Sequence, residues 1–167
     1  GSNDACGVSS VVLSQTSFSC SNVGTNIETL TVTDVNSNTA TCQLTITIQD
    51  NTNPTAICQD LTIDLSGTGT ATISASQINN GSNDACGLQP LSLSRDIFNC
   101  NDLGTVVIVL TATDQSNNSS SCNSNVTVED NIPPFLTCPP DQDFPLEPSC
   151  SAGLPDFTGL ATFPDNC

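Results

Sequence analysis

The chain has 167 residues, and its 17 acidic residues face a single basic residue, Arg95, which gives a formal net charge of −16. This charge makes binding to nucleic acids or an anionic membrane unfavourable, so we expect neither as a partner. No apolar stretch approaches the roughly 20 residues of a transmembrane helix, and we expect no membrane insertion in this segment. Frequent Thr and Val with no Met favour strands over helices.

The ten cysteines are spaced by tens of residues and lie in no C-x-x-C pair, and the chain has no histidine. Zinc, haem and redox motifs therefore lack their ligand sets. The remaining interpretation is a set of disulfides, which form in oxidising compartments. Domains of the size expected here are small enough to need such cross-links.

An internal repeat organises the chain. Residues 1–50 align without a gap on residues 81–130, and about 21 of the aligned positions are identical, including the block Gly-Ser-Asn-Asp-Ala-Cys-Gly. We therefore expect the C-terminal part of an immunoglobulin-like repeat at 1–50, a complete repeat at 51–130 and the N-terminal part of the next at 131–167. Pro54 and Pro133 follow the two boundaries, which indicates short, stiff linkers.

Within the complete repeat, short apolar runs alternate with turn residues, which predicts an all-β fold of tandem, disulfide-stapled immunoglobulin-like β-sandwich repeats of about 80 residues. In chain order, we expect strands at 57–65, 70–74, 88–94, 105–114 and 121–129. Residues 75–79 predict one helical turn. Segments 34–38 and 114–118 are rich in Asp and Asn and predict hairpin loops. In the first copy, Cys42, Leu44, Ile46 and Ile48 alternate with polar residues, as in a strand with one buried face.

The spacing of the cysteines within a repeat predicts two kinds of disulfide. The predicted pairs are Cys86–Cys100, its counterpart Cys6–Cys20, and Cys58–Cys122. In the last stretch, Cys167 aligns with Cys86, and we expect it to pair with the additional Cys150. Cys42 and Cys138 then pair outside the segment. Sequence alone leaves this connectivity open.

Several motifs occur together: Asp-Asn-x-x-Pro followed by a Cys, Asn-Asp-Ala-Cys-Gly, Thr-x-Thr-Asp-x-x-x-Asn, and a Cys that opens the last strand. In this combination the chain resembles the hyalin-repeat-like (HYR-like) modules of very large flavobacterial surface proteins, in particular gliding-motility adhesins exported by the type IX secretion system. The resemblance covers essentially the whole chain, although in the first two units the Cys after Asn-Asp-Ala departs from the hyalin pattern. It implies an immunoglobulin-like fold, many tandem copies, display on the bacterial cell surface, and a role in adhesion or in a surface filament.

Acidic residues gather near the predicted junctions, where carboxylate oxygens would suit a calcium ion. The candidate ligands are Asp4, Asp34, Asp50, Asp84, Asp114 and Asp130. The alternative is that these residues only shape turns. No cofactor is required by either interpretation.

We expect no enzymatic activity, because nothing in the sequence places two carboxylates in a cleft and an array would need an active site in every copy. We expect Arg95 to be a lone surface cation; the alternatives are that it anchors a ligand carboxylate or pairs with Asp96 or Asp102. We expect Phe18 and Phe98 to pack in the core beside the cysteines that follow them, and the alternative is that they stack on a ligand.

The leading functional hypothesis is a stiff stalk segment of a secreted cell-surface adhesin or filament, acting in adhesion or gliding motility. Its expected partners are the neighbouring repeats of the same long chain and an unknown surface or glycan ligand. Two alternatives stay open. One is a module that recognises a glycan or a protein, which the absence of Tyr and Trp disfavours. The other is a self-assembling fibre subunit.

Overall fold

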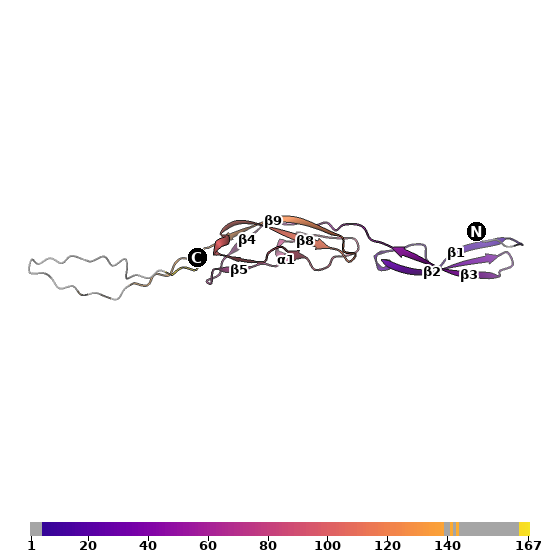
Figure 1. The fold of residues 1–167 in the computed structure, drawn as a ribbon, viewed down its shortest axis with the longest axis horizontal. Coiled ribbons are helices and arrows are strands. Elements are labelled where there is room, and N and C mark those ends of the chain that lie inside the picture. The colour runs from indigo at the N-terminus through magenta and orange to yellow at the C-terminus, as the bar shows by residue number, and fades with distance from the viewer. Residues whose placement is uncertain (1–4, 139–140, 142, 144–163) are drawn as a thin grey trace, which may run out of the picture. The chain divides into compact units, whose positions relative to one another are not determined.

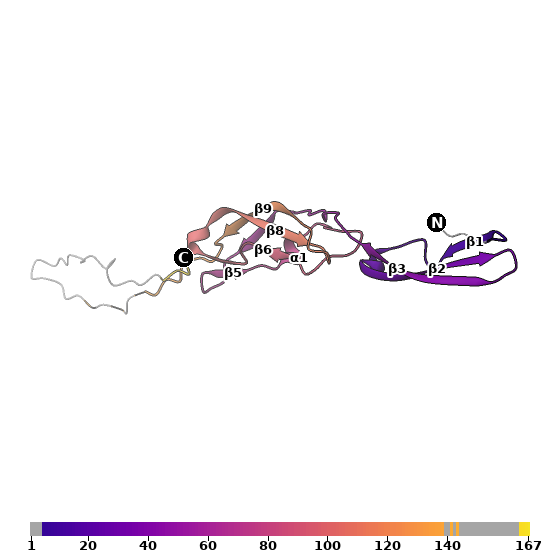
Figure 2. The same cartoon turned by 45° about the vertical axis from the view of Figure 1, so that its right-hand side comes forward.

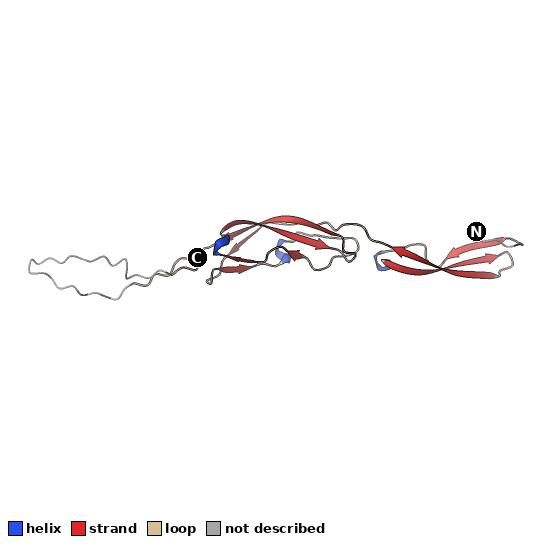
Figure 3. Ribbon diagram, in the orientation of Figure 1, coloured by secondary structure: helices blue, strands red, loops and turns tan. Residues whose placement is uncertain are grey.

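The structure is a computed structural model of the chain, and it describes residues 5–138, 141, 143 and 164–167. In this part of the chain, strands predominate and the helical elements are single turns (Figure 3). No helix among these residues is long and apolar enough to cross a membrane. The described residues form two compact units. One comprises those within Gly1–Ile57, Gly81–Ser92 and Thr111–Cys122, and the other those within Cys58–Asn80, Leu93–Leu110 and Asn123–Cys167.

The first unit contains a three-stranded antiparallel sheet, in which β2 (Gly24–Asp34) lies between β1 (Val8–Leu13) and β3 (Thr39–Ile48) (Figures 1 and 2). A 3₁₀ turn, η1 (Cys20–Asn22), precedes β2. The β2–β3 connection is the predicted hairpin loop at 34–38. Ser37 has a φ of 70° there, a left-handed backbone conformation that occurs in tight turns.

The predicted alternation along β3 is confirmed for its second half. Leu44, Ile46 and Ile48 are half-buried, whereas the intervening Thr45 and Thr47 are exposed. This apolar face of the first-copy sheet is only partly covered, because none of these three side chains is fully buried. Cys42, which begins the same series, is exposed.

The second unit has two layers. A sheet ordered β4-β9-β8-β6 is formed by β4 (Leu61–Asp64), β9 (Ser119–Glu129), β8 (Gly104–Thr113) and β6 (Ser92–Leu93). A two-stranded sheet pairs β5 (Thr70–Thr72) with β7 (Ile97–Asn99), and the short helix α1 (Ala75–Ile78) follows β5 (Figure 1). The first strand β4 runs parallel to the last strand β9. The long strands β8 and β9 begin in one unit and end in the other.

The core lies between these layers. Ile73, Ile78 and Phe98 come from the layer that contains β5, α1 and β7, and each is at most 7% exposed. They are accompanied by equally buried side chains of β8 and β9, namely Ile108, Leu110, Val126 and Val128. Each such side chain contributes about 1.5–3 kcal/mol through removal of apolar surface from water. The second copy therefore has the completed sandwich core.

The predicted all-β, immunoglobulin-like sandwich is confirmed, and so is the helical turn at 75–79. The expected first strand at 57–65 is shorter, because only β4 pairs continuously while Thr55 and Cys58 make isolated bridges. The strand expected at 88–94 is reduced to β6, since Pro90 has no N–H to donate to a ladder. Strand β7 was not predicted. The repeat boundaries at 50 and 130 stay a prediction.

Candidate functional site

A disulfide joins Cys20, at the start of η1, to Cys86, with 5.1 Å between their Cα atoms. Cys86 follows a loop in which the Oδ1 atom of Asp84 accepts a hydrogen bond from the backbone N–H of Cys86 at 2.7 Å. Cys20 belongs to the first predicted repeat and Cys86 to the second. By the predicted boundaries the bond joins one repeat to the next, and in the structure both cysteines lie within the same compact unit.

A second disulfide repeats this arrangement between Cys100 and Cys167, with a Cα–Cα distance of 5.4 Å. Cys100 begins the 3₁₀ turn η2 (Cys100–Asp102), as Cys20 begins η1. The sequence separations of the two bonds are 66 and 67 residues. Cys100 lies 80 residues after Cys20, and Cys167 lies 81 residues after Cys86, so the second bond is the first one shifted by one repeat period.

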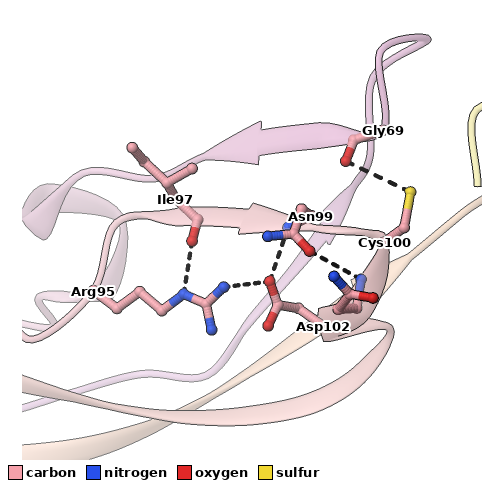
Figure 4. Close-up of polar contacts among 7 residues, drawn as sticks. Gly69, Arg95, Ile97, Asn99, Cys100 and Asp102 are labelled. Carbon is pink, nitrogen blue, oxygen red and sulfur yellow. Dashed lines mark hydrogen bonds and ion pairs between the residues drawn. The ribbon is translucent and has the colours of Figure 1, made fainter.

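The sulfur of Cys100 is closely packed. Its Sγ atom lies 3.1 Å from the carbonyl oxygen of Asn166 and 3.8 Å from that of Gly69, the second of which is drawn in Figure 4. A disulfide sulfur has no hydrogen to donate, so these are packing contacts and not hydrogen bonds. Gly69 has a φ of +67°, and a Cβ atom built on it would lie 2.5 Å from the Asn166 oxygen and 2.7 Å from the Cys100 sulfur. Only glycine fits here.

The predicted pairs Cys86–Cys100, Cys6–Cys20 and Cys150–Cys167 are wrong. Cys20 is bonded to Cys86, and Cys100 to Cys167, so no partner remains for the predicted bonds. Residues 86–100 contain β6 and β7, which pair with other strands and not with each other. Cys150 lies outside the described residues.

Of the remaining predictions, only the disulfide state of Cys58 and Cys122 is confirmed. Cys58 and Cys122 are both disulfide-bonded, and their pairing with each other stays a prediction. Cys42 and Cys138 are exposed thiols in the structure, and their pairing outside the segment stays a prediction.

Arg95 is not the lone surface cation that we expected. Its guanidinium forms a salt bridge with Asp102 and donates a hydrogen bond from Nε to the carbonyl oxygen of Ile97 at 2.7 Å (Figure 4). The Oδ2 atom of Asp102 also accepts a hydrogen bond from the backbone N–H of Asn99 at 2.8 Å. The guanidinium carbon lies 4.9 Å from the centre of the Phe98 ring, within reach of a cation–π interaction. Arg95 therefore fixes the turn that presents Cys100.

The predicted roles of the two Phe residues differ in outcome. Phe98 is 0% exposed and forms part of the core, as predicted. Phe18, its counterpart in the first copy, is only half-buried.

Asp34 and Asp114 close the two hairpin loops in the same way. In each, Oδ1 accepts hydrogen bonds from the backbone N–H groups two and four residues ahead at 2.8 Å, and Oδ2 accepts one from the side chain of Asn38 or Asn118. The Asn38 side chain is the main cause that lowers the pKa of Asp34. Burial raises the pKa of Asp114, but the hydrogen bonds from Asn118 and the loop backbone outweigh it, so the pKa lies below its usual value. These two carboxylates shape turns.

Two further carboxylates have the same character. Asp60 accepts hydrogen bonds from the backbone and side chain of Asn125 at 2.8 and 3.2 Å, and these bonds lower its pKa. The salt bridge to Arg95 lowers the pKa of Asp102. We refer to this set as the four loop carboxylates: Asp34, Asp60, Asp102 and Asp114.

Of the remaining calcium candidates, Asp50 and Asp84 lie near the first disulfide and Asp130 lies near the second. Asp50, Asp84 and the Cys86 sulfur have ligand atoms within 4.8 Å of one another. Near the second disulfide, Asp130 Oδ1 accepts a hydrogen bond from the Asn166 side chain at 3.0 Å. Asp4 lies outside the described residues.

The fit of this cluster to calcium is incomplete. In this cluster, the Oδ2 atom of Asp50 is buried without a hydrogen-bond partner, which would suit a cation. At the second disulfide, the Oδ1 atom of Asn166 is buried in the same way. However, Cys86 is in a disulfide and offers no thiolate, and two carboxylates fall short of the six to eight oxygens that calcium takes. Calcium binding at these junctions stays a prediction.

The chemistry available to these groups is structural. A general acid at neutral pH needs a raised carboxylate pKa, whereas the four loop carboxylates are held below their usual value by hydrogen bonds from their own loops. The carboxylates of the described site fix loops, among them the turn that begins with Cys100 and the loop before Cys86, and the disulfides join these cysteines to their partners.

The fold and the site define an all-β protein of disulfide-linked, immunoglobulin-like sandwich repeats. No family model and no curated protein matches the chain. Among solved structures, it is similar to extracellular cadherin domains 1–4 of protocadherin gamma B7, with a TM-score of 0.35 and 18% identity over 81% of this chain and 46% of that chain. It is also similar to the EC3-6 cis-dimer structure of protocadherin gammaB7, with a TM-score of 0.34 and 16% identity over 73% of this chain and 36% of that chain.

A third similar structure is mouse clustered PcdhgC3 EC1-3, with a TM-score of 0.34 and 14% identity over 66% of this chain and 44% of that chain. The chain thus spans less than half the length of each of these proteins. Likenesses this weak say nothing about its function.

Proposed function

We propose that the chain is part of a stiff extracellular stalk of a surface adhesin, in which consecutive repeats are joined by disulfides. The observation that carries this proposal is the pair of bonds Cys20–Cys86 and Cys100–Cys167, each between one predicted repeat and the next. A linker enclosed in a disulfide loop has less conformational freedom than an open one. Stable disulfides also require an oxidising environment, which supports an extracellular location.

The dimensions of the strands support a spacer role. The longest strand, β9, has 11 residues, which extend about 36 Å at about 3.3 Å per residue. Each repeat would then add about 35–45 Å of length with its linker. The net charge of −16 disfavours non-specific adhesion along such a stalk. The resemblance to HYR-like modules supports display on a bacterial cell surface and a role in adhesion or gliding; no enzymatic activity is part of this proposal.

Immunoelectron microscopy of cells that produce the protein tests this function. Antibodies raised against the purified chain are applied to intact and to permeabilised cells, with pre-immune serum as the control. A stalk predicts gold label on intact cells, displaced outward from the membrane. Label that appears only after permeabilisation would contradict the extracellular stalk. Saturable binding of one glycan per repeat on an array would instead favour the ligand-binding alternative.

A further inference from the structure

We propose that the disulfides Cys20–Cys86 and Cys100–Cys167 carry tension from repeat to repeat through a short covalent path, so that unfolding of a repeat releases almost no length. The inference rests on the proposed stalk function and extends it to the response of the stalk to pulling. Its basis is the connectivity of the two bonds, which differs from the pairing within repeats that the sequence suggested.

The covalent path follows from the order of the cysteines. The first bond ends at Cys86 and the second begins at Cys100. A pulling force that enters at Cys20 passes through the first disulfide, along residues 86–100, and through the second disulfide to Cys167. Residues 21–85 and 101–166 lie in loops closed by these bonds, so they are parallel branches and not links in the shortest path. We call residues 86–100 with the two bonds the short path.

The difference in length is large. Residues 86–100 extend to about 50 Å at most, and with the two bonds the short path reaches about 60 Å. The complete backbone from Cys20 to Cys167 would extend to about 500 Å. A chain with intact disulfides therefore has about one-eighth of the extensibility of the reduced chain over this stretch.

The short path is also held in the fold at its Cys100 end. Phe98 within it is fully buried, and Arg95 links it to η2 through the salt bridge to Asp102. Asn99 caps η2 by accepting a hydrogen bond from the backbone N–H of Asn101 at 3.0 Å (Figure 4). These contacts fix the residues that immediately precede the second bond. The Cys100 end of the short path is therefore anchored in the folded structure.

Single-molecule stretching of the full chain, tethered by tags at its two ends, tests the proposal. With disulfides intact, the fully unfolded chain should extend to about 130 Å; after reduction with dithiothreitol it should extend to about 570 Å. A contour length above about 150 Å in the non-reduced chain would overturn the proposal. The measurement needs no folded protein, because it reports only the covalent path.

Two double variants sharpen the result. Cys20→Ser with Cys86→Ser removes the first bond, and the non-reduced contour length should then exceed about 280 Å. Cys42→Ser with Cys138→Ser alters two cysteines that are thiols in the structure, and the length should stay near about 130 Å. If the first variant leaves the length unchanged, the short path does not exist. An unchanged contour length would refute the short path but not the stalk function, which the immunogold experiment tests separately. Gold label found only inside the cell would refute the stalk function and would not affect the contour length.

Discussion

Replacement of Gly69 by alanine should destabilise the second disulfide site. Gly69 has a φ of +67°, where an L side chain costs about 1–2 kcal/mol. The added Cβ atom would also lie 2.5 Å from the carbonyl oxygen of Asn166 and 2.7 Å from the sulfur of Cys100. Relieving that overlap displaces backbone or a disulfide sulfur and costs about 1–3 kcal/mol. We therefore expect Gly69→Ala to lower the free energy of unfolding by about 2–5 kcal/mol.

Gly67→Ala is the matched control, because nothing lies within 4 Å of a Cβ atom built at Gly67 and its φ is not left-handed. We expect a change within about 0.5 kcal/mol. Urea unfolding followed by far-ultraviolet circular dichroism measures both variants, since the chain has no Trp or Tyr for fluorescence. Equal stabilities for the two variants would refute the close packing of Gly69 against the second disulfide.

Three further predictions follow from the described contacts. Phe98→Ala should cost about 3–5 kcal/mol in urea unfolding, and the matched Phe18→Ala clearly less, since only Phe98 is fully buried; equal losses would contradict the half-open first-copy sheet. The four loop carboxylates have folded pKa values below their ordinary 3.8, so the unfolded chain takes up protons first as the pH falls. Their stabilising contribution should be complete above about pH 5 and decline below about pH 4, and a melting temperature that rises from pH 4 to pH 2.5 would count against these contacts. Trypsin has one site, Arg95, so cleavage of the non-reduced, denatured chain should leave one species on a gel if Cys58 and Cys122 are paired with each other, and two separate fragments if they are not.

Sequence patterns with a local cause were predictive. The two hairpin loops were expected from their Asp and Asn content, and Asp34 and Asp114 close them through hydrogen bonds to residues no more than four positions away. The alternation of Leu44, Ile46 and Ile48 reflects the geometry of a strand, in which successive side chains point to opposite faces. The helical turn at 75–79 depends on a capping box between Ser74 and Gln77, which is equally local.

Features that depend on long-range pairing were not predictable. Shifted by one repeat, Cys6–Cys20 becomes Cys86–Cys100 and Cys20–Cys86 becomes Cys100–Cys167, so the short pairing and the long pairing both recur along the chain. The short strand β7 was missed because its partner β5 is about 25 residues away and its own apolar run is brief. The salt bridge between Arg95 and Asp102 was one of two options that the sequence offered. The sequence shows that Gly69 lies in a turn, but it does not show that this turn packs against the sulfur of Cys100.

Disulfide mapping by mass spectrometry of the non-reduced protein, digested with a protease other than trypsin, tests the central claim most directly. That claim is that disulfides join consecutive repeats. It predicts linked peptides that contain Cys20 with Cys86 and Cys100 with Cys167. Linked peptides that contain Cys86 with Cys100, within one repeat, would contradict it.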